Sequence, residues 1–168
     1  MVSKKLKRVF FGARRPSSPS SPQPQTLMGQ FLRAVMLRWD EQTQLHVEVK
    51  KHGSKDGNEL TRAAFEVAVR RYFPPDTDLR VISGLVHEMR QVFGELVPVL
   101  ETEMLIRAAL GEEVPIDDIT LVPELTAKTF TLMGLTDKWS RDVSTVNSVL
   151  AEAEELVHRR GFAPTPAA

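Results

Sequence analysis

The sequence contains no cysteine. Its histidines and carboxylates are therefore the main candidates for acid–base chemistry and metal binding. The lack of cysteine excludes disulfides, thiolate nucleophiles and zinc sites built on sulfur. His87 and Glu88 begin the pattern H-E-x-x-H, but Gln91 stands where the second zinc-binding histidine is needed. On a helix His87 falls on the polar side, so we interpret it as a surface residue and predict no metal site.

The loops that commonly bind nucleotides or activate a serine are also absent from the sequence. It contains no G-x-S-x-G, no G-x-G-x-x-G and no G-x-x-x-x-G-K-[ST]. His46 and His52 flank a basic segment without neighbouring ligands, and His158 lies near the end of a predicted helix. These patterns predict no bound cofactor and no catalytic residue, and they favour a protein that is not an enzyme.

Glu101 is the one carboxylate that the sequence places among apolar side chains. On a helical wheel it lies between Met104 and Leu105 of a helix that is apolar on most sides. A buried carboxylate is unfavourable unless it is paired, so we expect Glu101 to be at least partly buried and to bind an arginine or a backbone donor. A structural ion pair explains this position better than catalysis does.

Charge is distributed very unevenly along the chain. The first 26 residues contain six bases and no acid, whereas the remaining residues contain 16 Lys and Arg against 22 Asp and Glu. The candidate residues for binding a polyanion or a partner are therefore the six bases of this arm: Lys4, Lys5, Lys7, Arg8, Arg14 and Arg15.

The arm combines these bases with an apolar run at residues 9–13 and a linker, PSSPSSPQPQ, at residues 16–25. Its composition predicts disorder in the isolated protein. Such a segment can dock on a partner protein, contact the phosphates of a nucleic acid, or lie on an anionic membrane surface. A wrongly assigned start codon would also produce such an arm, with Met28 as the alternative start.

The rest of the chain shows helical spacing of apolar residues, with proline, glycine and capping residues at the boundaries. Segment 45–50 alternates apolar and polar residues, and we favour a fraying helix or an extended segment there. Segment 50–58, with two glycines and three lysines, is expected to be an exposed loop. The predicted helices are about six: 27–39, 59–73, 77–93, 98–110, 123–135 and 141–160. The helix at 98–110 is apolar nearly all round and is expected to form the buried centre.

These patterns predict an all-α protein: a single-domain helical bundle over residues 27–162, a disordered basic arm at 1–26 and a disordered tail at 163–168. No apolar run approaches the roughly 20 residues that span a bilayer, so we expect a cytoplasmic protein. The function expected is a non-enzymatic interaction or adaptor module that uses a helical surface and the arm. The alternatives are a nucleic-acid-associated regulator that binds through the arm, and a small enzyme with a carboxylate-based site.

Overall fold

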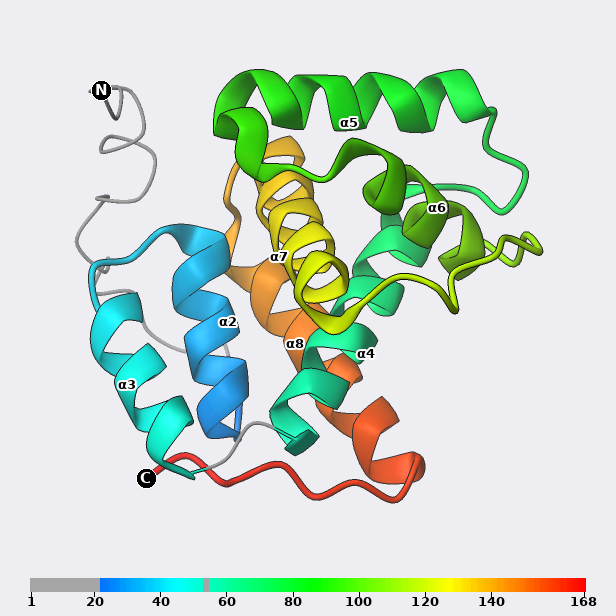
Figure 1. Cartoon of the computed structure of the whole chain (residues 1–168). Helices are drawn as coiled ribbons and strands as arrows, with labels where there is room; N and C mark the ends of the chain where they lie inside the picture. The colour runs from blue at the N-terminus through cyan, green and yellow to red at the C-terminus, as the bar shows by residue number, and fades with distance from the viewer. Residues whose placement is uncertain (1–21, 53–54) are drawn as a thin grey trace.

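The computed structural model describes residues 22–52 and 55–168, and over these residues it contains helices and no β-strand, which confirms the predicted all-α class (Figure 1). None of the described helices is long and apolar enough to cross a membrane. Seven α-helices and one short 3₁₀-helix are present in this part of the chain: α2 (Leu27–Leu37), α3 (Gln42–His52), α4 (Lys55–Tyr72), α5 (Leu79–Phe93), η1 (Gly94–Leu96), α6 (Val99–Ala109), α7 (Leu121–Lys138) and α8 (Val143–Arg159).

Helix α7 occupies the middle of the bundle, with α2, α4, α5 and α6 packed around it (Figure 1). All residues from Phe130 to Thr136 are buried. The polar groups in the stretch are satisfied within the helix: the hydroxyl of Thr131 donates to the carbonyl of Ala127, and that of Thr136 to the carbonyl of Leu132. A threonine bonded in this way can be buried at little cost.

The prediction that segment 98–110 forms the buried centre is therefore wrong. Helix α6 buries only Thr102, Leu105 and Ile106, and the side chain of Leu100 is 65% exposed. Hydropathy misidentifies the central helix because it counts the threonines of α7 as polar. Their hydroxyls are hydrogen-bonded within the helix and need no partner from neighbouring helices. The centre of the bundle thus lies one helix further along the chain.

Helix α4 begins at Lys55, several residues before the start predicted at Glu59. The glycine that suggested a loop, Gly57, lies inside the helix and is buried against Met28. A Cβ at position 57 would lie 3.0 Å from the Cε of Met28. Gly57 therefore serves close packing of α4 against α2, and segment 50–58 is not one continuous loop.

Segment 45–50 belongs to α3, which resolves the choice left open by its alternating pattern in favour of a helix. Leu45 and Val49, four residues apart, face α2, and Val49 is the one buried residue of α3. Val47 points away from them and is 47% exposed. This added helix accounts for the difference from the six helices predicted.

The two ends of the described chain are joined. The carboxylate of Glu154 in α8 accepts hydrogen bonds from the backbone N–H groups of Gln25 and Thr26, at 3.0 and 2.9 Å, and from the Thr26 hydroxyl at 2.6 Å. The N–H of Leu27 donates to the carbonyl of Thr165, and the N–H of Ala167 donates to that of Gln25.

Residues 163–168, expected to be a free disordered tail, are thus held against residues 25–27 by backbone hydrogen bonds. The same contacts show that residues 24–26 of the predicted arm belong to the folded part, where Pro24 is buried. The sequence could not indicate this pairing because the two segments are so far apart along the chain. The prediction of disorder for residues 1–21 lies outside the described residues.

Gly29 is predicted to be essential to this junction. A Cβ at position 29 would lie 2.6 Å from the Glu154 carboxylate, 2.7 Å from Pro24 and 2.8 Å from the Thr26 hydroxyl. The substitution Gly29→Ala should therefore lower the free energy of unfolding by about 1–3 kcal/mol, as overpacking does. Denaturant titration followed by circular dichroism measures the change.

Gly84 provides the matched control. It is exposed on α5, and a Cβ at this position would have nothing within 4 Å. Gly84→Ala should raise the free energy of unfolding by about 0.5–1 kcal/mol through helix propensity. If both variants shift stability in the same direction, the proposed tight junction at Gly29 is wrong.

Candidate functional site

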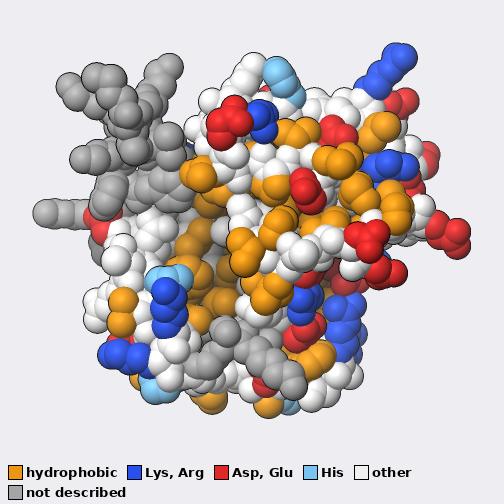
Figure 2. Space-filling view, viewed as in Figure 1, with side chains coloured by type: hydrophobic (Ala, Val, Ile, Leu, Met, Phe, Trp, Pro, Cys, Tyr) orange, Lys and Arg blue, Asp and Glu red, His pale blue; other side chains and the backbone are white. Residues whose placement is uncertain are grey.

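A large apolar groove of about 620 Å³ lies between α2, α3 and α7. Figure 2 shows it as a hollow with a hydrophobic floor, left of centre on this face. We call it the α2–α3–α7 groove. Its lining residues are Phe31 and Val35 of α2; Asp40 of the α2–α3 turn; Gln42, Thr43 and His46 of α3; and Thr129, Phe130 and Met133 of α7.

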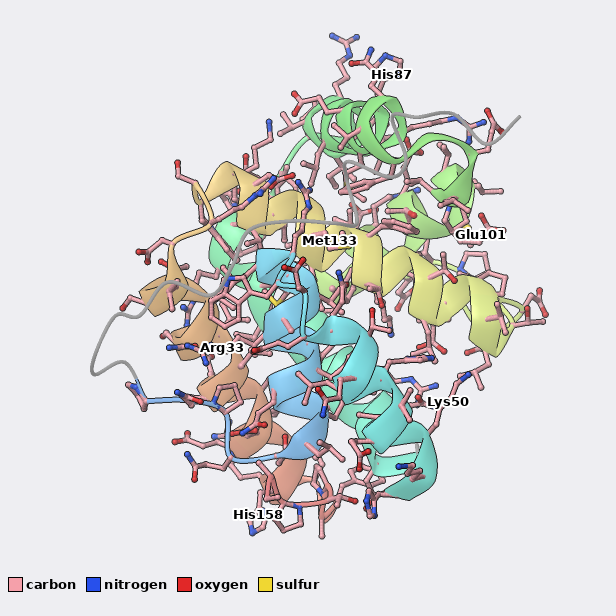
Figure 3. The ribbon with its side chains drawn as sticks, turned by 90° about the vertical axis from the view of Figure 1, so that its left-hand side faces the viewer. Arg33, Lys50, His87, Glu101, Met133 and His158 are labelled. Carbon is pink, nitrogen blue, oxygen red and sulfur yellow. The ribbon has the colours of Figure 1, made fainter. Side chains whose placement is uncertain are left out.

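The floor of the groove is rigid because its side chains are held from behind. Val35, Phe130 and Met133 are 7%, 8% and 2% exposed. The ring of Phe130 packs against that of Phe93, with centroids 4.9 Å apart. Met133 lies on α7 beside the C-terminal half of α2 (Figure 3). A preformed apolar floor of this kind is typical of ligand-binding clefts.

Helix α3 forms the outer wall and is attached mainly to α2. The imidazole of His46 packs against the ring of Phe31, with centroids 5.5 Å apart and planes inclined by 43°. On this wall Thr43 is exposed and contributes a small polar side chain. The wall therefore consists of the His46 ring, packed against Phe31, and a polar edge at Thr43, and it stands beside an apolar floor.

The groove is acidic at one end. Asp40 is exposed and is the one carboxylate among its lining residues, with Glu41 next to it in the α2–α3 turn. Neither carboxylate forms an ion pair with any residue in the described part of the chain. Two adjacent carboxylates without an ion-pair partner favour a cation at this end of the groove.

The groove contains Asp40, His46 and Thr43, residue types that could act as an orienting acid, a base and a nucleophile. Such a triad requires hydrogen bonds that connect the three groups. Among the described residues the ring of His46 packs at an angle against that of Phe31, and no hydrogen bond joins His46 to Asp40 or Thr43. The three groups are therefore not connected as a triad among the described residues.

The residues that the sequence suggested for chemistry are far from one another. Figure 3 shows His87 on α5, Glu101 on α6 and His158 at the end of α8, at separate parts of the molecule. His87 is exposed and hydrogen-bonds to Gln91 at 3.0 Å, as expected of a surface residue. No three His, Asp or Glu residues in the described part of the chain are grouped as metal ligands would be.

Glu101 is half-buried at the start of α6, consistent with the partial burial expected. The expected partner is not found: no arginine or backbone donor in the described residues lies within hydrogen-bonding distance of its carboxylate. The reason is the outer position of α6, which leaves this carboxylate in contact with solvent. The six bases of the arm, Lys4 to Arg15, lie outside the described residues.

All three arginines of α4 form ion pairs with carboxylates of the protein itself. Arg70 binds Glu66 at 2.6 Å, and Arg71 binds Glu152 of α8 at 2.7 Å. A phosphate group would have to displace these partners.

A network of charged residues links α4 to α7. The Glu124 carboxylate accepts from the guanidinium of Arg62 at 2.8 and 3.0 Å and from the ammonium of Lys128 at 2.7 Å. The hydrogen bond with Arg62 lowers the pKa of Glu124 to about 2, with Lys128 contributing in the same direction. A carboxylate held ionised in this way serves packing and is unsuited to exchange protons near neutral pH.

Sequence reasoning missed the α2–α3–α7 groove, since its lining comes from three helices. The one signal in the sequence is the broad apolar stripe of α2, which includes Phe31 and Val35 on a helix of 11 residues. A stripe broader than one neighbour can cover leaves part of its surface open.

No family model, curated protein or solved structure matches this chain.

The charged network predicts a specific dependence of stability on pH. Because folding lowers the pKa of Glu124 from 4.5 to about 2, its contribution is complete above about pH 4.5 and is lost as the pH falls toward 2. Glu124→Gln should lower the free energy of unfolding at pH 7 by about 1–2 kcal/mol, allowing for solvent screening. The deficit should shrink as the pH falls from about 4.5 to about 3.

Denaturant titrations at several pH values test this prediction. Glu113→Gln is the control, because Glu113 is exposed and forms no ion pair with another described residue. This control should track the unmodified protein at every pH. A deficit for Glu124→Gln that stays constant between about pH 7 and about pH 3 would show that the carboxylate charge is not the cause.

Proposed function

We propose that this protein is a non-enzymatic peptide-binding module whose α2–α3–α7 groove receives a short segment of a partner protein. The segment carries apolar side chains next to a lysine or arginine. The observation that supports this most directly is a buried apolar floor with the carboxylates of Asp40 and Glu41 at one end, neither of which has an ion-pair partner among the described residues. The proposed peptide-binding role is a more specific form of the interaction or adaptor role expected from the sequence, which acts through a helical surface.

The dimensions support a peptide side-chain site. Ligand clefts typically measure about 300–1,000 Å³, and the groove measures about 620 Å³. Phe31, Val35 and Phe130 are the kinds of side chain against which apolar anchors of a bound amphipathic segment pack. The exposed Thr43 and the half-buried Gln42 at the edge provide a polar rim, as protein interfaces generally have.

The alternatives have less support from the described residues. A carboxylate-based enzyme needs an acid or base poised near neutral pH in a cleft, whereas Glu124 is held ionised by Arg62 and Lys128. A nucleic-acid surface built on α4 would need free cations, whereas Arg62, Arg70 and Arg71 of this helix are paired with carboxylates. Polyanion binding through Lys4 to Arg15 remains a separate prediction that concerns the arm.

The proposal is tested by selecting peptides from a randomised display library on the full-length protein. The enriched peptides should share an aromatic or aliphatic pair flanked by lysine or arginine. Synthetic versions of these peptides are then titrated by fluorescence anisotropy against variants of the wall. Thr43→Lys places a cation in the groove beside Asp40 and should weaken binding about tenfold or more, through charge repulsion and loss of space.

Gln44→Lys is the matched control, because Gln44 is exposed on the same helix and does not line the groove. It adds the same charge at the neighbouring position and should leave affinity within about twofold. Equal weakening by both variants would indicate a general charge effect and contradict a groove site. Selected peptides without the apolar and basic pattern would contradict the proposed partner chemistry.

A further inference from the structure

The groove has a candidate occupant within the same chain. We infer that residues 9–15, VFFGARR, bind in the α2–α3–α7 groove of their own molecule and compete there with the partner segment. This inference rests on the proposed function of the groove. In it, Phe10 and Phe11 contact the apolar floor, while Arg14 and Arg15 lie at the acidic end formed by Asp40 and Glu41.

The position at which the arm leaves the described structure suits this assignment. Pro24 is buried, and Thr26 is fixed to Glu154 at the start of α2, so the arm departs from the N-terminal end of the helix that forms the groove floor. Asp40 lies just beyond the C-terminal end of this helix. An arm segment that follows α2 along its length therefore reaches the acidic end.

The length of the linker agrees with this path. Helix α2 has 11 residues and is about 16 Å long at roughly 1.5 Å per residue. The steps from Pro22, the first described residue, back to Arg15 cross the proline-rich linker and span about 22 Å at roughly 3.1 Å per residue. This linker is thus longer than α2, so it can run the length of the helix toward Asp40, and the apolar residues 9–13 follow Arg15 into the groove.

Charge favours the same pairing. The first 26 residues include six bases and no acid, and the groove offers carboxylates at Asp40 and Glu41 that have no ion-pair partner among the described residues. Many cations of the body are already bound to carboxylates, as Arg71 is to Glu152. The arm therefore supplies the cations that the acidic end of the groove lacks.

Tethering makes even a weak contact effective. A segment joined by a short linker experiences an effective concentration in the millimolar range. An intrinsic dissociation constant of about 0.1 mM would then fill the groove in about nine molecules out of ten. A partner peptide would bind the remaining open fraction, with its apparent affinity reduced about tenfold.

Paramagnetic NMR on the full-length protein tests where the arm lies. Because the chain has no cysteine, Gly12→Cys gives a unique position for a spin label, and the methionine methyl groups are observed after ¹³C labelling. The label should broaden the methyl signal of Met133 in the groove, while Met104 on α6 should stay sharp. The same label with Phe10→Ser and Phe11→Ser should leave both signals sharp.

A second measurement uses the competing peptide. In the full-length chain, Phe10→Ser with Phe11→Ser should raise the affinity for a selected groove peptide about tenfold, since the arm no longer occupies the groove. If Met133 is not broadened and this variant does not change peptide affinity, the inference fails. In that case the proposed function of the groove would still stand if Thr43→Lys abolishes peptide binding. If no peptide binds the groove, both the inference about the arm and the proposed function fail.

The test also separates binding within one molecule from binding to a second copy. Spin-labelled protein without ¹³C is mixed with ¹³C-labelled protein without the spin label. Broadening of Met133 in this mixture would show that the arm enters the groove of another molecule, which overturns the intramolecular assignment. If Met133 stays sharp in the mixture but is broadened in the chain that carries both labels, the intramolecular assignment is supported.

Discussion

The complete burial of α7 between Phe130 and Thr136 constrains the rest of the fold. Successive residues of a helix face in all directions, so several helices must pack against this stretch, and α2, α4, α5 and α6 do so; on the side that they leave open, Phe130 and Met133 form the floor of the α2–α3–α7 groove. The stretch tolerates burial because Thr131 and Thr136 bond to carbonyls of their own helix. Gly134 lets α5 come close: a Cβ there would lie 2.8 Å from the Cγ of Met89. The helices are thus arranged around one element whose polar groups need no outside partner.

The α2–α3–α7 groove is a consequence of how α2 ends beside this central helix. Arg38 ends α2 in the left-handed conformation, with φ of 58°, which turns the chain toward α3. Its guanidinium lies near the ring of Phe93, 5.3 Å from the centroid, and binds Asp137 on α7. The residue that ends α2 therefore also fixes α2 to α7, while α3 continues on the outer side and leaves the intervening surface uncovered. A non-glycine residue in this conformation is unfavourable alone, and here the backbone N–H of Arg38 donates to the carbonyls of Ala34 and Val35 at the end of the helix.

Local signals made several elements predictable, whereas the central helix and the groove depended on contacts between distant segments. The positions of α5 and α8 follow from their apolar stripes, from Asp142 as the cap of α8 and from Gly94 at the end of α5, although α5 is capped by Asp78 and begins at Leu79, two residues after the start predicted at 77. The start of α4 was missed because Gly57 looks the same in sequence whether it serves a turn or close packing against Met28. Thr131 and Thr136 likewise look polar until their bonds to the preceding turn are known. The groove could not be predicted because Phe31, His46 and Met133 meet only when three helices are packed.

Electrostatic pairing within the body gives the charge asymmetry of the chain a physical meaning. Ion pairs such as Arg62 with Glu124 and Arg71 with Glu152 join separate helices and use carboxylates of the folded part. Asp40 and Glu41 stand outside this pairing at the end of an apolar groove, and neither forms an ion pair with another described residue. Two of the acids after residue 26 therefore lie together at a place where no cation of the described residues pairs with them. The bases of the arm likewise lack a neighbouring opposite charge, since the first 26 residues contain no acid. A groove that lacks a cation and a tethered segment that lacks an anion are complementary in both charge and hydrophobicity, and they belong to the same chain.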